Sequence, residues 1–276
     1  MLKRKIAIRR GVDAVGVGIA NISQSLAVLL LMGPIVLVIW LSFGRDTYTT
    51  VPPTGYGLMW YENAFTQPEF LPAFWVSLKV ALIVMPASLL IGTLAALALH
   101  RSNARGLGII QAAIYSPIII PQVVTGVAAL YFFSALAFYN SFWIVVISHI
   151  VITFPYAVRT VLVALARYDP ALDEAAAGLG ARPWKVLWYV TLPLIRPGLF
   201  AGALFAFIMS FDDFTVTIFV IGPTTHTLPI AIYQYLEWNV DPTVSAVSAL
   251  LVLLAVVVML FVERLIGLDR FVGVRG

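Results

Sequence analysis

The stretch DEAAAGLGARPWKVLWYVTLP, residues 173–193, is a short amphipathic segment between two long apolar runs. The whole chain has 276 residues, of which 61% are hydrophobic and 11% are charged. This composition lies far outside the range of soluble globular domains. We therefore expect an all-α membrane protein in which residues 173–193 belong to a loop between two membrane spans.

Six apolar segments are long enough to cross a bilayer. A helix rises by ~1.5 Å per residue, so a ~30 Å hydrocarbon core requires about 20 residues. Pro117 and Pro121 lie within the third segment and predict a kinked or broken helix there. Pro86 and Pro155 predict milder kinks in the second and fourth segments. The predicted spans are 25–43, 74–99, 107–138, 141–166, 198–221 and 244–266.

Lysine and arginine gather in alternate connections and predict the orientation. They lie near the amino terminus, between spans two and three, in the loop at 167–197 and in the tail, whereas the opposite loops contribute only Arg45. Because cytoplasmic loops are enriched in these residues, both termini are expected in the cytoplasm. The chain then consists of a cytoplasmic segment at 1–24, a six-helix transmembrane domain at 25–266 and a cytoplasmic tail at 267–276. We interpret the basic start as part of a retained first helix, because no small-residue cleavage site follows it.

The longest cytoplasmic connection has the punctuation of two helices. Asp169 and Pro170 are typical of an N-cap and a first helical turn, and Gly180 is typical of the residue that follows a helix. Pro183 then begins a second helix, which we expect to end before Pro193. The sequence therefore predicts a helix–turn–helix in the loop between spans four and five.

Two interpretations of this loop follow from its residues. Three alanines at 175–177 leave a low surface that lets another protein approach closely, and Glu174 offers a charge to an arginine on that protein. Alternatively, the loop lies on the lipid headgroups with large apolar side chains facing lipid. These side chains are Trp184, Leu187 and Trp188. Composition alone leaves both interpretations open.

The spacing in this loop resembles the EAA loop of ABC importer permeases. The residues that carry the resemblance are Glu174, Ala175, Ala176, Gly180, Val190, Leu192 and Pro193, with Val190 where the family usually has isoleucine. In that family the loop forms coupling helices that lie in a groove of the ATPase subunit and transmit ATP-driven closure. The resemblance extends over nearly the whole chain from the first span onward. It implies that these residues, apart from the variant Val190, couple the chain to an ATPase.

Carboxylates within an apolar run are costly and mark the second candidate site. Asp212 and Asp213 lie within the fifth predicted span, where such groups usually face a polar passage or a partner. Neighbouring helical residues point ~100° apart, so at most one aspartate faces a passage directly. A purely structural polar contact is the alternative. Gln122 and Thr125 either line the same passage or satisfy backbone groups that Pro121 leaves free.

Other features of the spans favour packing over chemistry. We interpret His149 as a hydrogen-bond donor between helices in preference to a proton relay, because no relay partner is evident in the sequence. Gly198 and Gly202 form a small-residue pair typical of close helix packing.

The acidic pair also bears on the substrate. Two carboxylates in a passage favour a cationic substrate. The stretch around them resembles the spermidine and putrescine branch of the permeases, in which an acidic pair is followed by Gly-Pro, Leu-Pro and Ile-Tyr. Here these pairs are Gly222 and Pro223, Leu228 and Pro229, and Ile232 and Tyr233. The same branch includes importers of opines, amino-acid derivatives and phosphonates, so the substrate stays open.

Composition also excludes several classes of function. The chain has no cysteine, and its three histidines are scattered, so no metal site is expected. No GxxxxGK stretch is present, so the chain does not bind ATP by that route. Its basic residues report orientation, and no binding of nucleic acid is expected. A membrane-embedded enzyme would require a convergent acid–base or metal set, which the spacing does not show.

The resemblance implies partners and a location. We expect two ATP-binding cassette subunits that bind ATP and Mg²⁺, a second permease chain that is different but homologous, and an extracytoplasmic substrate-binding protein, all at a bacterial inner membrane. This chain would itself hold no cofactor and catalyse no reaction. An ion-coupled secondary transporter that uses Asp212 and Asp213 as its ion site is the remote alternative.

Overall fold

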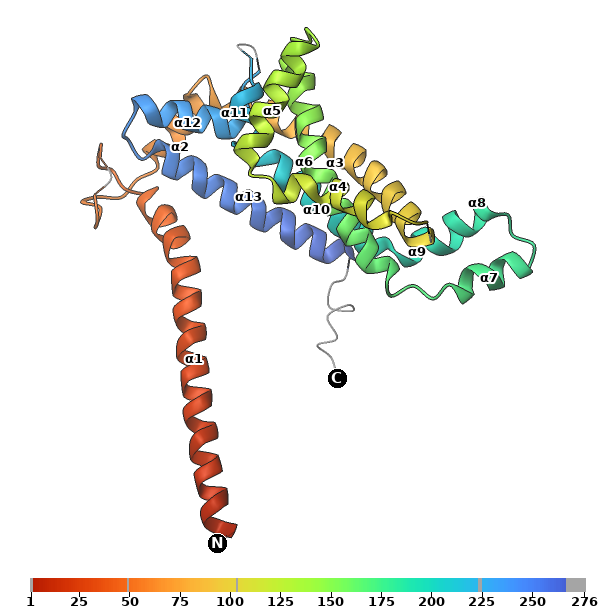
Figure 1. Ribbon diagram of the computed structural model, residues 1–276. Coiled ribbons are helices and arrows are strands. Elements are labelled where there is room, and N and C mark those ends of the chain that lie inside the picture. Colours follow the sequence, from red (N-terminus) through yellow and green to blue (C-terminus); the bar gives the residue numbers. More distant parts are fainter. Residues whose placement is uncertain (1, 49, 103, 223–224, 267–276) are drawn as a thin grey trace. The chain divides into compact units, whose positions relative to one another are not determined.

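The computed structural model describes residues 2–48, 50–102, 104–222 and 225–266. The predicted tail at 267–276 lies outside these residues. The chain divides into two compact units, one formed by Met1–Gln67 with Leu236–Gly276 and the other by Pro68–Tyr235. No strand occurs in the described ranges, where β pairing is limited to an isolated bridge between Gly44 and Tyr56. The fold is therefore helical, as the sequence predicts (Figure 1).

The described residues of the first unit contain three complete helices. They are α1 (Leu2–Leu41), α2 (Met59–Thr66) and α13 (Thr243–Ile266). Helix α13 packs against both α1 and α2, and the Asn63 side-chain amide donates to Thr243 Oγ1 at 2.7 Å. The apolar part of α1, Ala20–Leu41, is not buried within the unit. Such a surface requires lipid or another protein around it.

A compact loop joins α1 to α2 in the first unit. The Asp46 carboxylate accepts hydrogen bonds from the Thr50 hydroxyl at 2.5 Å, from the Thr54 backbone N–H at 2.8 Å and from the Thr54 hydroxyl. These bonds, above all the one from Thr50, hold the pKa of Asp46 below its usual value. The loop is therefore ordered by a side chain that replaces missing backbone partners.

Apart from the end of α12, which belongs to the first unit from Leu236 onward, the remaining described helices lie in the second unit. They are α3 (Phe70–Arg101), α4 (Leu107–Ile119), α5 (Gln122–Ala135), α6 (Ser141–Leu165), α7 (Ala171–Gly178), α8 (Pro183–Val186), a π-helical turn η1 (Leu187–Thr191), α9 (Leu192–Leu194), α10 (Arg196–Phe211), α11 (Thr217–Val220) and α12 (Leu228–Trp238). Helices α3, α6 and α10 pack against one another, and α7 and α8 project from them (Figure 1).

Close backbone approach holds α3 and α10 against α6. A Cβ atom at Gly92 would lie 2.7 Å from Ala157 Cβ, and one at Gly198 would lie 2.7 Å from the Thr160 carbonyl oxygen. At Gly202 a Cβ would lie 2.7 Å from the Thr160 hydroxyl. These contacts confirm the predicted close packing at Gly198 and Gly202. Helices in a membrane associate through such contacts, because lipid tails are as apolar as the side chains.

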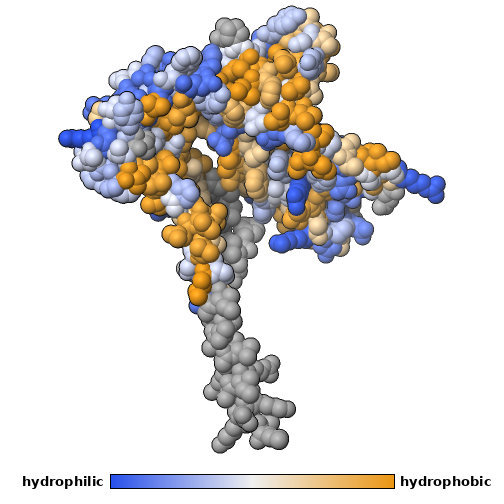
Figure 2. All heavy atoms as spheres, turned by 60° about the vertical axis from the view of Figure 1, so that its left-hand side comes forward, coloured by the Kyte–Doolittle hydropathy of each residue, from blue (hydrophilic) through white to orange (hydrophobic). Residues whose placement is uncertain are grey.

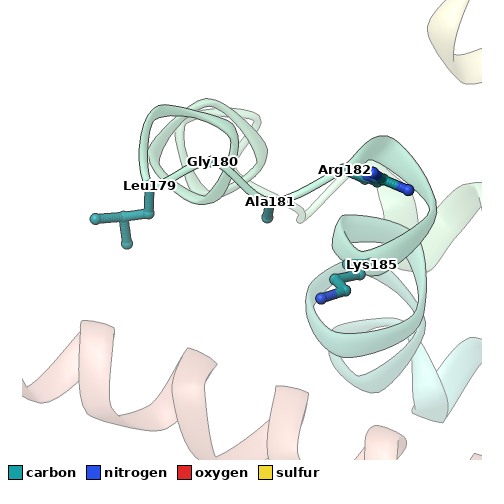
Figure 3. Close-up of a pocket in the computed structure, with 5 residues that line it drawn as sticks. All are labelled: Leu179, Gly180, Ala181, Arg182 and Lys185. Carbon is teal, nitrogen blue, oxygen red and sulfur yellow. The ribbon is translucent and has the colours of Figure 1, made fainter.

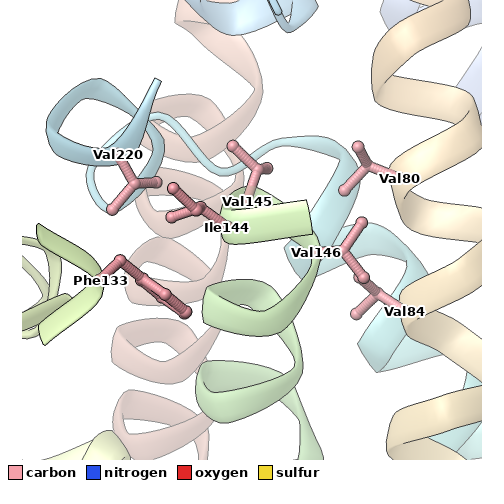
Figure 4. Packing of buried hydrophobic residues seen from close by; sticks show 7 residues of the cluster. All are labelled: Val80, Val84, Phe133, Ile144, Val145, Val146 and Val220. Atoms are coloured by element: carbon pink, nitrogen blue, oxygen red, sulfur yellow. The ribbon is translucent and has the colours of Figure 1, made fainter. Parts of the chain in front are cut away.

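A valine-rich cluster fills the space between α3, α5, α6 and α11 (Figure 4). Its buried members are Val80, Val84, Phe133, Ile144, Val145, Val146 and Val220. Branched side chains lose little rotamer freedom on packing, which suits an interior built without the help of water. On the face shown in Figure 2, hydrophobic side chains also form broad areas over the outside of the helices.

Within the described residues, four single helices are long and apolar enough to cross a membrane. They are Ala20–Leu41, Phe70–Arg101, Ser141–Leu165 and Thr243–Leu260. Two bent pairs pass the same test together and raise the number to as many as six. In one pair α4 and α5 meet at 103° around Ile120 and Pro121, which confirms the predicted break in the third span. The other pair joins the segment Pro183–Leu194 to α10 at 72°.

Two predicted features of the helices are wrong. The fifth span, 198–221, is not one helix, because α10 ends at Phe211 and irregular backbone separates it from α11. The second loop helix does not end before Pro193 but continues to Leu194 through the π-helical turn. Helices α2 and α12 were also not expected from the sequence.

Candidate functional site

Helix α7, the first arm of the helical hairpin at residues 171–194, begins and ends as its sequence predicts. The Asp169 carboxylate accepts from the Ala171 backbone N–H at 2.9 Å, so it caps the start of α7 as predicted. At the other end Gly180 has φ of +82°, and its N–H donates to the Ala177 carbonyl at 2.9 Å. The next N–H, of Ala181, reaches back to the Ala176 carbonyl at 3.1 Å. This pair of bonds is a Schellman motif, in which a left-handed glycine ends the helix.

The second arm of the hairpin contains a widened turn. Pro183 occupies the first turn of α8, where its missing N–H costs nothing. Further on, the Leu192 N–H donates to the Leu187 carbonyl, five residues earlier. A regular α-helix would bring Pro193 against the carbonyl four residues before it, whereas a π-helical turn has a wider backbone ring. This geometry explains why the helix continues past the residue expected to end it.

The outer surface of the hairpin is both apolar and basic. Leu179 is 91% exposed, and Trp184 and Trp188 are also exposed, with ring centroids 5.2 Å apart. A surface pocket of about 440 Å³ lies between the arms, with Leu179 on the α7 side and the cations Arg182 and Lys185 on the α8 side (Figure 3). Exposed apolar side chains rimmed by charge are typical of a docking surface.

The residues of the EAA-like motif are spread along the hairpin. Glu174 and Ala175 are exposed, and Ala176, Leu192 and Pro193 are partly exposed. Gly180 lies at the tip beside the pocket. The structure thus leaves Glu174 accessible to a partner, while the positions near Pro193 lie where the hairpin joins α10.

Asp173, next to Glu174, is bound within the chain. Its Oδ2 lies 3.1 Å from Arg101 Nη2 at the end of α3, and its Oδ1 accepts from the Tyr168 hydroxyl and, at 3.2 Å, from Thr191 Oγ1. Burial, together with the hydrogen bond to this carboxylate, raises the pKa of Tyr168. The sequence gives no signal for this role of Asp173, because its partner Arg101 lies 72 residues away.

A buried polar cluster lies where α10 gives way to α11. Asp213 is 7% exposed, and its Oδ2 accepts from the Val216 N–H at 3.1 Å, the Thr217 N–H at 2.9 Å and the Thr217 hydroxyl at 2.9 Å. The carboxylate therefore takes the place of helix carbonyls at the start of α11. These bonds also explain the end of α10, since a short polar side chain competes with the helix for backbone N–H groups.

His149 connects this cluster to α6. Its ring is fully buried, with Nδ1 2.9 Å from Ser210 Oγ and Nε2 2.8 Å from Thr217 Oγ1. Asp213 Oδ2 lies 3.4 Å from the same Nε2. His149 thus joins three helices, in agreement with its interpretation as an interhelical hydrogen-bonding residue. Ser210 and Thr217 were missed, since isolated hydroxyl residues in an apolar run give no signal.

Asp212 differs from its neighbour, because it is exposed. Within the described residues its carboxylate has no hydrogen bond or ion pair. Its neighbours in the sequence include two phenylalanines that pack on other rings. Phe211 stacks on Phe207 with centroids 5.9 Å apart, and the Phe214 ring lies 5.0 Å from that of Tyr233. The structure therefore separates the two aspartates into a bound one and an accessible one.

Gln122 and Thr125 lie at the start of α5, and both are partly exposed. Helix α5 packs against α11, and a Cβ at Gly126 would lie 2.7 Å from the Phe219 ring. The third and fifth predicted spans therefore meet near these residues. Among the residues that the structure describes, no hydrogen bond joins Gln122 or Thr125 to either aspartate.

The described part of the chain contains no group of three or more His, Asp or Glu side chains that could hold a metal ion. The polar cluster is instead satisfied internally, by hydroxyl and backbone groups. These hydrogen bonds hold α6, α10 and α11 together.

Long apolar helices, with a hairpin that projects from them, define an integral membrane protein. The family described as binding-protein-dependent transport system inner membrane component matches residues 88–267. The chain belongs to this family and is a permease subunit of an ABC importer. Its role is transport, in which ATP drives the movement of substrate.

Curated relatives and solved structures agree with this assignment. The chain is 32% identical to the spermidine/putrescine permease protein PotC of Escherichia coli K12, over 88% of this chain and 91% of that protein. It is 31% identical to the putrescine permease protein PotI of the same organism, over 81% and 84% respectively. A crystal structure of a bacterial ABC transporter for alginate import aligns with a TM-score of 0.71 at 17% identity, covering 89% of this chain and 93% of that one. This last likeness supports the fold alone.

Proposed function

We propose that the chain is a permease subunit of an importer for polyamines, such as spermidine or putrescine, or for related organic cations. The names of two relatives, PotC and PotI, support this substrate class. The observation in the structure that carries the proposal is Asp212, an exposed carboxylate at a helix break whose neighbours in the chain include Phe211 and Phe214. A carboxylate and aromatic faces together attract an ammonium group.

The carboxylate and the aromatic rings would attract an ammonium group through different interactions. The Asp212 carboxylate supplies a full charge, and its low number of internal bonds leaves its oxygens available to the substrate. Aromatic faces add about 0.5–1 kcal/mol when exposed and about 2 kcal/mol when water is excluded. An aliphatic polyamine also has methylene segments, which pack well on rings such as Phe211 and Phe214. Gln122 and Thr125 would line the same route from α5, and Asp213 would support its wall.

We propose that α4 and α5 together form the third span and that α10 and α11 together form the fifth, so that the chain crosses the membrane six times. The amino terminus, the carboxyl terminus and the hairpin at 171–194 then lie in the cytoplasm, in accord with the distribution of lysine and arginine. The membrane would be the inner membrane of a bacterium, which agrees with the family description. Each break exposes backbone groups inside the membrane, as expected where a span lines a polar route.

The hairpin would dock on an ATP-binding cassette subunit. Glu174, Ala175, Ala176 and Gly180 would form the contact, with Leu192 and Pro193 carrying its motion into α10. Two such ATPase subunits, a second and homologous permease chain and an extracytoplasmic binding protein would complete the importer. ATP and Mg²⁺ would bind to the ATPase subunits, and this chain would hold no cofactor.

Other substrates remain as alternatives within the same architecture. Opines, amino-acid derivatives and phosphonates carry anionic groups, which an exposed carboxylate repels, so the structure favours the cation. A secondary transporter would require an ion site at Asp212 and Asp213. The bonds of Asp213 to the backbone leave little of its charge for an exchangeable ion.

The test is substrate-stimulated ATP hydrolysis by the assembled importer in lipid vesicles, with its binding protein present. Spermidine and putrescine are compared with an opine, an amino-acid derivative and a phosphonate. We expect stimulation by the polyamines and a clear loss of it in Asp212→Asn. Glu69→Gln, which removes another exposed carboxylate, is the matched control and should behave as wild type. Stimulation by an anionic ligand alone, unaffected by Asp212→Asn, would contradict the cation proposal and leave the importer assignment intact.

A further inference from the structure

The hairpin is attached to the rest of its unit at two points along the chain. One is the connection from α6, which ends at Leu165, and the other is the connection to α10, which begins at Arg196. The second arm is fixed further, because its Leu187 and Leu192 pack against a buried cluster that includes Leu97 of α3, whereas α7 packs on α8 and η1. A force applied to α7 is therefore passed on most directly through a contact that α7 itself makes with the membrane helices.

The ion pair between Arg101 and Asp173 supplies a contact at a third place. Arg101 is the last residue of α3, and Asp173 lies in the first turn of α7. Their side chains approach to 3.1 Å and are 48% and 28% exposed. Among the described residues, this is the hydrogen-bonded or ionic contact that joins α7 to α3. Helix α3 is not adjacent to the hairpin in the sequence, since α4, α5 and α6 lie between them.

Two hydrogen bonds from within the chain hold the Asp173 carboxylate in the orientation in which it faces Arg101. Its Oδ1 accepts from the Tyr168 hydroxyl and from Thr191 Oγ1, and its Oδ2 faces Arg101. Thr191 is itself 1% exposed, so this end of the network is fixed by packing. An exposed ion pair between two mobile side chains contributes little, whereas one held by a hydrogen-bond network keeps its geometry. The network therefore sets position more than stability.

We propose that Asp173 is a positioning residue that connects the coupling hairpin to α3, so that movement of the hairpin reaches α3 as well as α6 and α10. The proposal rests on the function proposed above, in which an ATPase subunit docks on the hairpin. Helix α3 is well placed to pass the movement on, because its Gly92 lies directly against α6. With this contact the three packed helices receive the motion together.

The test measures the amount of polyamine transported per ATP hydrolysed by the complete importer in vesicles. We expect Asp173→Asn and Arg101→Gln each to lower this ratio by about threefold or more, a typical size for a residue that modulates coupling. Asp169→Asn is the matched control: it removes a nearby charge, and asparagine caps a helix as well as aspartate does. It should keep the wild-type ratio.

A second measurement separates positioning from a general structural effect. The chain has no cysteine of its own, so Arg101→Cys with Asp173→Cys creates one defined thiol pair. The double variant should show a low ratio, and a short bifunctional thiol reagent that joins the two positions should restore it. A merely structural defect would not be repaired by this link.

The outcomes distinguish the two proposals. Variants that transport with the wild-type ratio, or a thiol link that restores nothing, would overturn the role of Asp173 and leave the importer standing. A wild-type complex that hydrolyses ATP without any response to substrate or binding protein would overturn the proposed function, and the role of Asp173 with it.

Discussion

The hairpin at residues 171–194 and the helix break after α10 each contain two adjacent acidic residues, and in each pair the roles divide in the same way. Asp173 is bound within the chain and Glu174 is exposed, while Asp213 is bound and Asp212 is exposed. The surroundings differ: the side chain of Asp173 is 28% exposed and that of Asp213 is 4% exposed. One acid of each pair thus fixes a local structure, and the other remains accessible to a partner or substrate.

The buried member of the second pair should be the most sensitive. Asp213→Ala would leave the N–H groups of Val216 and Thr217 without their acceptor, and each unsatisfied buried group costs about 1–3 kcal/mol. We expect a large loss of thermal stability and no assembled importer. Thermal unfolding in detergent and size-exclusion chromatography measure both. Asp212→Ala should unfold like the wild type, and an equal loss there would show that the two aspartates do not divide their roles.

The exposed member of the first pair should matter for transport and not for folding. Glu174→Lys reverses a charge on the proposed docking surface and breaks no internal contact. Stability should therefore stay unchanged. Retention of the ATPase subunit should fall by tenfold or more, as expected when a charged contact at an interface is reversed. Co-purification and thermal unfolding of the same sample report the two effects. A folded variant that still binds the ATPase and transports normally would remove Glu174 from the docking surface.

The tip of the hairpin offers an intermediate effect. Gly180→Ala places a side chain in a left-handed conformation, which costs about 1–2 kcal/mol, although the space around the residue is open. We expect the turn to relax and substrate-stimulated ATP hydrolysis to fall by about fivefold, with the spans unaffected. Gly178→Ala, two residues earlier within α7, is the control and should retain activity. Equal behaviour of the two variants would show that the left-handed turn does not orient the second arm.

The smallest effect is expected for Tyr168→Phe, which removes one of the donors to Asp173 and leaves Arg101 and Thr191 in place. The pKa of Tyr168 is raised above its ordinary value of about 10. A group with a raised pKa in the folded state contributes stability below its unfolded pKa, and the contribution is lost as the pH rises through the folded pKa. The difference in melting temperature between wild type and variant should therefore be small and constant from about pH 6 to pH 9. A difference that declines within this interval would contradict the assignment.

The sequence predicts the elements of this fold that depend on local rules. Hydropathy identifies the long helices, the prolines at 117 and 121 predict the broken third span, and Gly180 is identified by the left-handed conformation that few other residues adopt. The end of α10 escapes prediction, because the apolar run continues through it and a hydropathy window averages over the break. The helix ends because the Asp213 carboxylate accepts hydrogen bonds from the backbone N–H groups of Val216 and Thr217.

Contacts between residues far apart in the sequence are the second feature that cannot be predicted from it. Asp173 and Arg101 are 72 residues apart, and His149 and Thr217 are 68 residues apart, so neither pairing has a signature in sequence spacing. For the same reason the sequence left the two aspartates of the fifth span equivalent. Only the packing of α6 against α10 and α11 shows which of them is enclosed.

The π-helical turn at Leu187–Thr191 has a consequence for the direction in which the hairpin presents its tryptophans. A turn of this kind holds one residue more than a regular α-helical turn, and each residue rotates a helix by ~100°. Deleting one residue here would give a more regular helix, yet it would swing Trp184 and Trp188 by about a quarter of a revolution relative to α10. The π-helical turn thus fixes the angle between α10 and the face of the hairpin that carries the two exposed tryptophans.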